Sequence, residues 1–250
     1  MRLRIIIFSL ILFLLSLSYS FEFAVLGDSR AEGGAPLVFE GLLEKISKTN
    51  AEFIIHLGDF LNESNPKEYE YLKKQLRKTN LPIYFVPGNH DIRGESTIKA
   101  FQEFTGKPLY YYFDYENARF IILNNAFGKL GEEQINWLIE VLKSAKGKYK
   151  FVFMHQPVVA PNFFLFFHKA DPFESKRLIK IFEEEKVNYV FAGHIHMYYR
   201  KVINGVVYII SGVAGAFPHV SSETNSGKPH FVLVKVTEKG IEDKMILLEK

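Results

Sequence analysis

The chain alternates short apolar runs with longer stretches in which apolar residues recur every three or four positions. The first pattern predicts strands and the second predicts helices. We predict strands at residues 21–27, 52–57, 82–86, 110–114, 118–124, 150–154, 188–192, 206–211, 229–236 and 241–248, and helices at residues 36–48, 66–79, 96–105, 131–145 and 173–186. The alternation in the first half favours parallel strands with crossover helices.

The last three predicted strands differ, because no helix separates them. Residues 206–211, 229–236 and 241–248 predict a meander, with a tight turn at Glu238–Gly240. Mixed sheets, two of them packed face to face with helices outside, accommodate both halves in an α/β fold. No linker divides the chain, which favours one domain.

The first 20 residues have a pattern of their own. Arg2 and Arg4 precede an apolar run to about Leu17, and small residues follow up to Ser20. This pattern is typical of a secretory signal peptide cleaved after Ser20. The run is short for a membrane span of about 20 residues, and an uncleaved N-terminal anchor is the alternative. We therefore expect a periplasmic or secreted protein, membrane-anchored if residues 1–20 are retained.

Composition narrows the function classes. The 250 residues are 48% hydrophobic and 15% aromatic, enough for a sizeable core. The absence of cysteine excludes disulfides, thiolate metal ligands and a lipid-modified cysteine. The net charge of +3 falls to +1 when Arg2 and Arg4 are removed (3 − 2). Nucleic-acid binders usually carry a basic stripe, so we expect no nucleic-acid partner.

Side chains that can bind metal follow five of the predicted strands. They are Asp28 after the first strand, Asp59 after the second, Asn89, His90 and Asp91 after the third, His155 after the sixth, and His194 and His196 after the seventh. The carboxyl ends of strands in open α/β sheets converge on the ligand crevice, so these side chains should meet. Glycines before four of the groups suit tight turns that direct the next side chain into it.

Each strand end alone has an ordinary explanation. A Gly-Asp pair also makes turns and helix caps, and His155 alone also fits a hydrogen-bonded loop. In the extended segment 193–196, however, His194 and His196 face the same way, so each can hold one metal ion of a pair. Carboxylates and imidazoles without thiolates suit Mn, Fe or Zn. The five strand ends together favour a metal centre.

The order Gly-Asp, Gly-Asp, Gly-Asn-His-Asp, His and Gly-His-x-His resembles that of the calcineurin-like metallophosphoesterases, which include the purple acid phosphatases and the Mre11-type nucleases. The resemblance covers about residues 21–215. It implies a four-layer α/β/β/α sandwich of two mixed β-sheets, with a single such domain over residues 21–250. It also implies hydrolysis of a phosphate mono- or diester substrate by a metal-activated hydroxide in a dinuclear site.

By this resemblance, two divalent metal ions (Mn, Fe or Zn) lie between the strand ends. The implied ligands are Asp28 and His196 for the first ion, Asp59 as the bridge, and Asn89, His155 and His194 for the second. His90 would donate a proton to the leaving group or stabilise the transition state. Asp91 would orient the His90 ring and fix which nitrogen carries the proton.

The first motif departs from the family pattern. The family usually has Asp-x-His there, whereas this chain has Asp28-Ser29-Arg30, and an arginine cannot be a metal ligand. Purple acid phosphatases instead supply a tyrosine three residues after the bridging aspartate, where this chain has Asn62, a weaker ligand. Arg30 therefore either joins the catalytic group by binding the substrate phosphate or forms a structural ion pair, for instance with Glu32 or with neighbours of Asp59. The first metal site has lost one ligand in either case.

Two further features bear on function. Five phenylalanines lie within residues 163–173, where they predict either a buried segment or an apolar lid that contacts the membrane surface. The loss of the motif histidine favours a degenerate binding module of the cell envelope with little or no catalysis. The intact His90–Asp91 pair favours an enzyme. We predict the enzyme, an exported metal-dependent phosphoesterase.

Overall fold

The computed structural model describes residues 19–30, 36–161, 169–221 and 223–249. Its strands are β1 (Ser20–Leu26), β2 (Ala51–His56), β3 (Ile83–Phe85), β4 (Tyr111–Tyr115), β5 (Ala118–Ile122), β6 (Tyr149–Phe153), β7 (Tyr189–Ala192), β8 (Tyr198–Ile203), β9 (Val206–Ser211), β10 (His230–Thr237) and β11 (Gly240–Leu247). Its α-helices are α1 (Pro36–Ile46), α2 (Pro66–Leu76), α3 (Glu95–Thr105), α4 (Glu132–Ser144) and α5 (Pro172–Glu184). Every predicted strand and helix is confirmed within a few residues at each end.

The strands form two mixed sheets. The order is β11-β10-β1-β2-β3 in the first and β4-β5-β6-β7-β9-β8 in the second. Strands β1, β2 and β3 are parallel, as are β5, β6, β7 and β9, whereas antiparallel partners lie at the β11 edge and at both edges of the second sheet. The predicted parallel pairing of the first half is confirmed for these strands.

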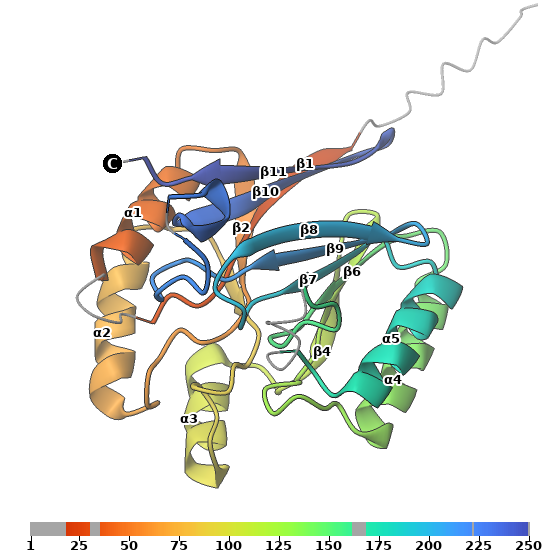
Figure 1. Cartoon of the computed structure of the whole chain (residues 1–250), viewed down its shortest axis with the longest axis horizontal. Coiled ribbons are helices and arrows are strands. Elements are labelled where there is room, and N and C mark those ends of the chain that lie inside the picture. The colour runs from red at the N-terminus through yellow and green to blue at the C-terminus, as the bar shows by residue number, and fades with distance from the viewer. Residues whose placement is uncertain (1–18, 31–35, 162–168, 222, 250) are drawn as a thin grey trace, which may run out of the picture.

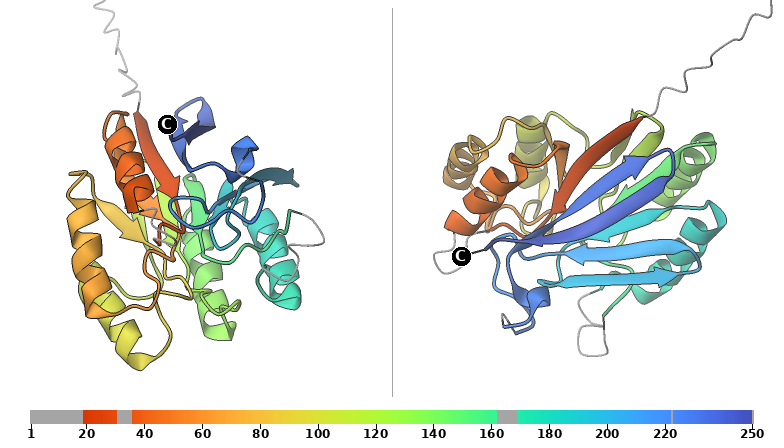
Figure 2. Two further views of the ribbon diagram at one scale, coloured as in Figure 1. Left: turned by 60° about the vertical axis from the view of Figure 1, so that its left-hand side comes forward. Right: turned by 90° about the horizontal axis from the view of Figure 1, so that it is seen from above.

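The two sheets face each other and the helices cover their outer sides. In Figures 1 and 2, α1, α2 and α3 (orange to yellow) lie on one side, and α4 and α5 (green to teal) lie on the other. Buried aromatic rings fill the space between the sheets, with Phe23 and Phe120 at 5.1 Å and Phe153 and Phe191 at 5.3 Å between ring centroids. Burial of these rings is the main force that holds the layers together. The predicted α/β/β/α sandwich is confirmed.

Two expectations for the C-terminal strands are wrong. Strand β8 was not predicted, because it is an edge strand with half-exposed side chains and its apolar run is broken by Arg200 and Lys201. The predicted meander does not form either, because β9 lies between β7 and β8 in the second sheet. Of the three strands of the predicted meander, β10 and β11 pair as a hairpin, which joins the first sheet beside β1. The connection after β9 therefore crosses between sheets.

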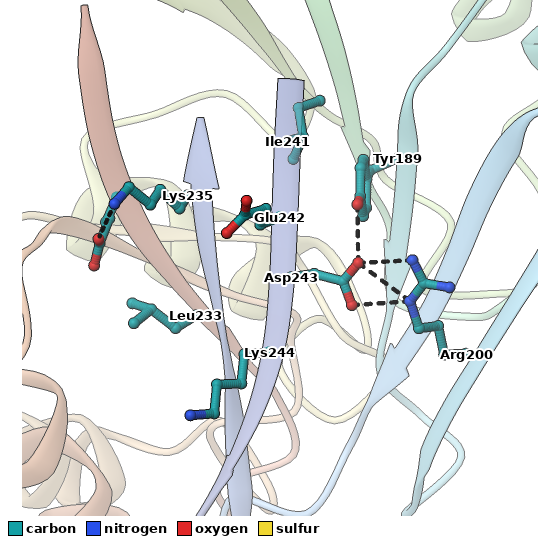
Figure 3. A pocket seen from close by; sticks show the side chains of 9 residues that line it. Tyr189, Arg200, Leu233, Lys235, Ile241, Glu242, Asp243 and Lys244 are labelled. Carbon is teal, nitrogen blue, oxygen red and sulfur yellow. Dashed lines mark hydrogen bonds and ion pairs between the residues drawn. The ribbon is translucent and has the colours of Figure 1, made fainter. Parts of the chain in front are cut away.

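Side chains also join the two sheets at one edge. Arg200 of β8 forms hydrogen bonds of 2.8–3.1 Å with the carboxylate of Asp243 on β11, which also accepts one of 2.8 Å from the hydroxyl of Tyr189 (Figure 3). These residues line a pocket with Leu233 and Lys235. None of the predicted metal-binding residues lines this pocket, so its contacts serve the packing of the sheets.

Candidate metal centre

Three of the predicted metal ligands have an unusual backbone conformation. Asp28, Asp59 and His194 each follow a strand-end glycine and have φ angles of 58°, 56° and 65°. Non-glycine residues rarely adopt this left-handed region, and strain of this kind is often found at functional sites. Local hydrogen bonds compensate for it, because Asp28 N–H donates to Gly58 O at 3.0 Å and His194 N–H donates to the Asp28 carboxylate at 2.9 Å.

The glycines before these residues allow a close approach of the loops. A Cβ atom at Gly88 would lie 2.3 Å from both the backbone nitrogen and Oδ1 of Asp59. A Cβ atom at Gly193 would lie 2.5 Å from Oδ2 of Asp28. Any other residue at these two positions would displace a carboxylate that the site uses.

Four of the predicted ligands come together after β2, β3, β6 and β7. One ligand atom each of Asp59, His155 and His194 lies within 4.8 Å of the others. The amide oxygen of Asn89 is 3.0 Å from Nε2 of His155. A carboxylate, an amide oxygen and two imidazoles fit a divalent ion such as Mn, Fe or Zn.

A backbone contact fixes which nitrogen of His155 faces this group. Its Nδ1 donates to Leu57 O at 2.8 Å, which leaves Nε2 to face Oδ1 of Asp59 at 3.3 Å. Burial opposes the charge of both groups, but their mutual attraction outweighs it. It holds the pKa of Asp59 well below its usual range and raises the pKa of His155 to about 9. Without a cation the pair is charged, and a bound divalent ion would replace the imidazole proton.

The two remaining predicted ligands lie beside this group. Nε2 of His196 is 3.5 Å from Oδ1 of Asp28, and its Nδ1 donates to Phe217 O at 2.6 Å. Burial works against the imidazolium, yet Asp28 raises the pKa of His196, while the charge of Arg30 lowers it. The ring of His219 stacks on that of His196, with 4.1 Å between centroids.

Arg30 faces the same centre and forms contacts within it. Its Nε is 3.9 Å from Oδ2 of Asp59, and its Nη1 is 2.5 Å from Nε2 of His90. Because a guanidinium only donates hydrogen bonds, Nε2 of His90 accepts from Arg30. Nδ1 of His90 lies 2.9 Å from Asn62 O and 2.8 Å from Nη2 of Arg93. Arg30 thus forms an ion pair with Asp59. Glu32, the partner named from the sequence, lies outside the described residues.

The predicted role of Asp91 is wrong. Its carboxylate is fully buried and accepts four backbone hydrogen bonds of 2.7–3.1 Å, from Asp59, Phe60, Leu61 and Gly88. The ring of His90 is held by Asn62 O instead. Burial and the neighbouring Asp59 raise the pKa of Asp91 to about 7, although the N–H groups of Gly88 and Leu61 favour its charged form. Asp91 therefore organises the loop backbone.

Comparison with known proteins agrees with this geometry. The family model of the calcineurin-like phosphoesterases matches residues 21–198. The chain belongs to this family. Its members are metal-dependent hydrolases of phosphoric esters, and this phosphoesterase is assigned to the same enzyme class.

Named relatives have phosphatase and phosphodiesterase activities. Human serine/threonine-protein phosphatase CPPED1 is 26% identical over 84% of this chain and 78% of its own length. A 3',5'-cyclic-nucleotide phosphodiesterase of Nostoc is 24% identical over 81% of this chain and 79% of its own length. The structure of a purple acid phosphatase from yellow lupin matches 92% of this chain and 52% of its own, with a TM-score of 0.75 at 16% identity, which supports the fold.

Two residues of this phosphoesterase were not predicted to act at the site. Asn125 accepts hydrogen bonds from the backbone N–H groups of His155 and Gln156 through its amide oxygen at 2.9 and 3.0 Å. It follows β5, so the strand-end signal, applied there, would have found it. His56 is buried, and its Nε2 is 2.9 Å from Oγ of Ser29. No local pattern signals that contact.

The phenylalanine-rich stretch is only partly visible in this phosphoesterase. Residues 163–168 lie outside the described residues. Phe173, in the first turn of α5, is 87% exposed. The predicted apolar lid and its membrane contact stay predictions.

Proposed function

We propose that this phosphoesterase hydrolyses a phosphate mono- or diester beside Asp59, Asn89, His155 and His194, with Arg30 and His90 acting on the substrate. One observation carries the proposal: the ligand group and the Arg30–His90 pair face opposite oxygens of the same carboxylate, that of Asp59. A phosphate next to Asp59 is then within reach of both groups.

The metal ligands, Arg30 and His90 have separate roles in this proposal. A divalent ion at the ligand group would lower the pKa of a bound water and neutralise charge on the phosphate. The Arg30 guanidinium donates to phosphate oxygens, for which its planar fork is suited. Nε2 of His90 bears no proton while it accepts from Arg30. When Arg30 turns to the phosphate, Nε2 is free to take up a proton from water, and the imidazolium then delivers it to the leaving oxygen. Nδ1 of His90 stays bonded to Asn62 O, so the ring keeps its orientation.

Hydrolysis of two model esters tests the proposal. The purified protein is stripped of metal, restored with Mn²⁺, Fe²⁺ or Zn²⁺, and assayed with p-nitrophenyl phosphate and bis-p-nitrophenyl phosphate. We expect metal-restored turnover that His90→Asn lowers by about 10²–10⁴-fold, the usual contribution of general acid catalysis. The preferred ester then identifies a monoesterase or a diesterase.

The control is metal binding, because His90 is not in the ligand group. Mn²⁺ affinity of His90→Asn should match that of the wild type within a few fold. Full activity of His90→Asn, or no turnover with any of the three metals, would contradict the proposal.

We also propose that the protein acts outside the cytoplasm. The support is the pattern of residues 1–20, with Arg2 and Arg4 before an apolar run. Among the described residues no helix combines the length and hydropathy needed to cross a membrane. Fractionation of cells that express the full chain, followed by N-terminal sequencing, tests this proposal. A mature N-terminus near Phe21 in the periplasm or medium is expected, and an intact chain in the cytosol would contradict it.

A further inference from the structure

We propose that this phosphoesterase holds one resident metal ion, at Asp59, Asn89, His155 and His194, and that the Arg30 guanidinium takes the place of a second ion. The inference rests on the proposed function and defines the cations that this function uses. It departs from the two-ion centre that the sequence motifs imply. Three features of the site carry it.

The first feature is the surroundings of Asp59, the residue expected to bridge two ions. Its Oδ1 is 3.3 Å from Nε2 of His155, on the side of the ligand group. Its Oδ2 is 3.9 Å from Nε of Arg30 and 4.0 Å from Nε2 of His90. One oxygen therefore faces metal ligands, whereas the other already faces a permanent cation.

The second feature is the way Arg30 is held there. Its backbone N–H donates to Asp59 O at 3.1 Å, and its Nη1 bonds to the ring of His90. The preceding residue, Ser29, is fixed by the buried ring of His56. The side chain of Arg30 is only 12% exposed. A guanidinium this far from water needs nearby carboxylates, so its position is built into the site.

The third feature is the small number of ligands on the Arg30 side. Asp28 and His196 approach each other to 3.5 Å. Within the described ranges, the one group of three histidine or carboxylate ligands is Asp59, His155 and His194, and it includes neither of them. A divalent ion between Asp28 and His196 would also face the like charge of Arg30 in a buried site, where screening is weak.

The replacement changes what the second cation can do. A guanidinium neutralises phosphate charge and orients two oxygens through parallel N–H groups, but it cannot lower the pKa of a bound water as a metal does. Arg30 would therefore position and neutralise the phosphate, while water activation is confined to the side of His155 and His194. The chain keeps two positive centres with a single ion.

Metal stoichiometry tests the inference without an activity assay. The full-length protein and two variants, Arg30→His and Arg30→Lys, are dialysed against Mn²⁺, and bound Mn is measured by mass spectrometry. Electron paramagnetic resonance then distinguishes an isolated Mn²⁺ from an exchange-coupled pair. We expect one isolated ion in the wild type and in Arg30→Lys, which keeps the charge. We expect two coupled ions in Arg30→His, which restores the missing imidazole.

Each outcome decides the matter. Two coupled ions in the wild type would overturn the inference. One ion in a folded Arg30→His would also overturn it, because Arg30 would then not be what keeps a second ion out. If Arg30→His does not fold, the wild-type spectrum and Arg30→Lys still decide. One ion in the wild type without ester hydrolysis would contradict the proposed function alone.

Discussion

At the scale of single residues, Asp91 shows how one buried carboxylate can shape a metal centre without touching the metal. Its two oxygens accept the N–H groups of two loops, those that begin at Gly58 and Gly88. The same loops supply Asp59 and Asn89 to the ligand group. The spacing of these ligands therefore depends on a residue whose side chain lies behind them.

Replacement of Asp91 by asparagine should destabilise the fold as well as the site. The amide NH₂ would point at backbone N–H groups that donate to the carboxylate in the native chain, so we expect Asp91→Asn to lower the free energy of unfolding by about 2–4 kcal/mol. Urea denaturation measures the loss, and Glu70→Gln, in an exposed ion pair on α2, is the control that should be near neutral. Unchanged stability with impaired catalysis would instead favour a role in orienting His90.

At the scale of elements, the site is built from strand ends whose glycines let two loops touch. Gly88, after β3, has no room for a side chain, because the Asp59 backbone and carboxylate fill the space. At Gly94, six residues later at the start of α3, a Cβ atom would meet no other atom within 4 Å. Packing therefore requires a glycine at position 88, whereas it allows a larger residue at position 94.

Alanine at these two positions makes a matched pair. Gly88→Ala forces the loop off Asp59, and we expect a loss of about 1–3 kcal/mol in stability, the usual range of overpacked cores, with weaker Mn²⁺ binding. Gly94→Ala should change stability by less than about 0.5 kcal/mol, as surface substitutions usually do. Thermal unfolding and metal titration of both variants provide the measurement. Equal effects of the two would contradict the close approach at Gly88.

At the scale of the whole molecule, the contacts between layers set the response to pH and to loss of charge. His230, at the start of β10, is buried, and desolvation lowers its pKa to about 4. It is thus neutral in the folded protein. Its Nδ1 donates to Lys228 O at 2.8 Å. At the edge of the first sheet, Arg200 and Asp243 join β8 to β11 (Figure 3).

The buried His230 should make stability fall in mild acid. The unfolded chain takes up a proton at pH near 6.5 and the folded chain only near pH 4, so stability is lost as the pH falls between these values. Compared with His230→Phe, the wild type should lose on the order of 2–3 kcal/mol more between pH 7 and 4.5. Urea denaturation at both pH values measures the difference, in which all other groups cancel. An equal loss in both proteins would refute it.

The ion pair between the sheets should contribute more than an exposed one. Asp243 is 6% exposed in its side chain and Arg200 is 39% exposed, so the pair is partly shielded from water. A double-mutant cycle with Arg200→Ala and Asp243→Ala should give a coupling of about 1–2 kcal/mol, above the usual range of surface pairs. Lys99 and Glu103 on α3 form an ion pair in which both side chains are exposed. This pair is the control and should couple by less than about 0.5 kcal/mol. Equal couplings would show that the shielding has no effect.

The sequence by itself determined the layers and the residues available for the site. Hydrophobic periodicity and strand-end glycines are local signals. They located every strand of the described chain except β8, and they placed Asp28, Asp59, His155 and His194 at strand ends. Only the tertiary structure decided that Arg30 contacts His90, 60 positions away, and that Asp91 binds the backbone of Asp59, 32 positions away. It also decided that β9 joins β7. These outcomes depend on which groups far apart in the sequence come into contact and lose their hydration together. A local sequence pattern does not contain that information.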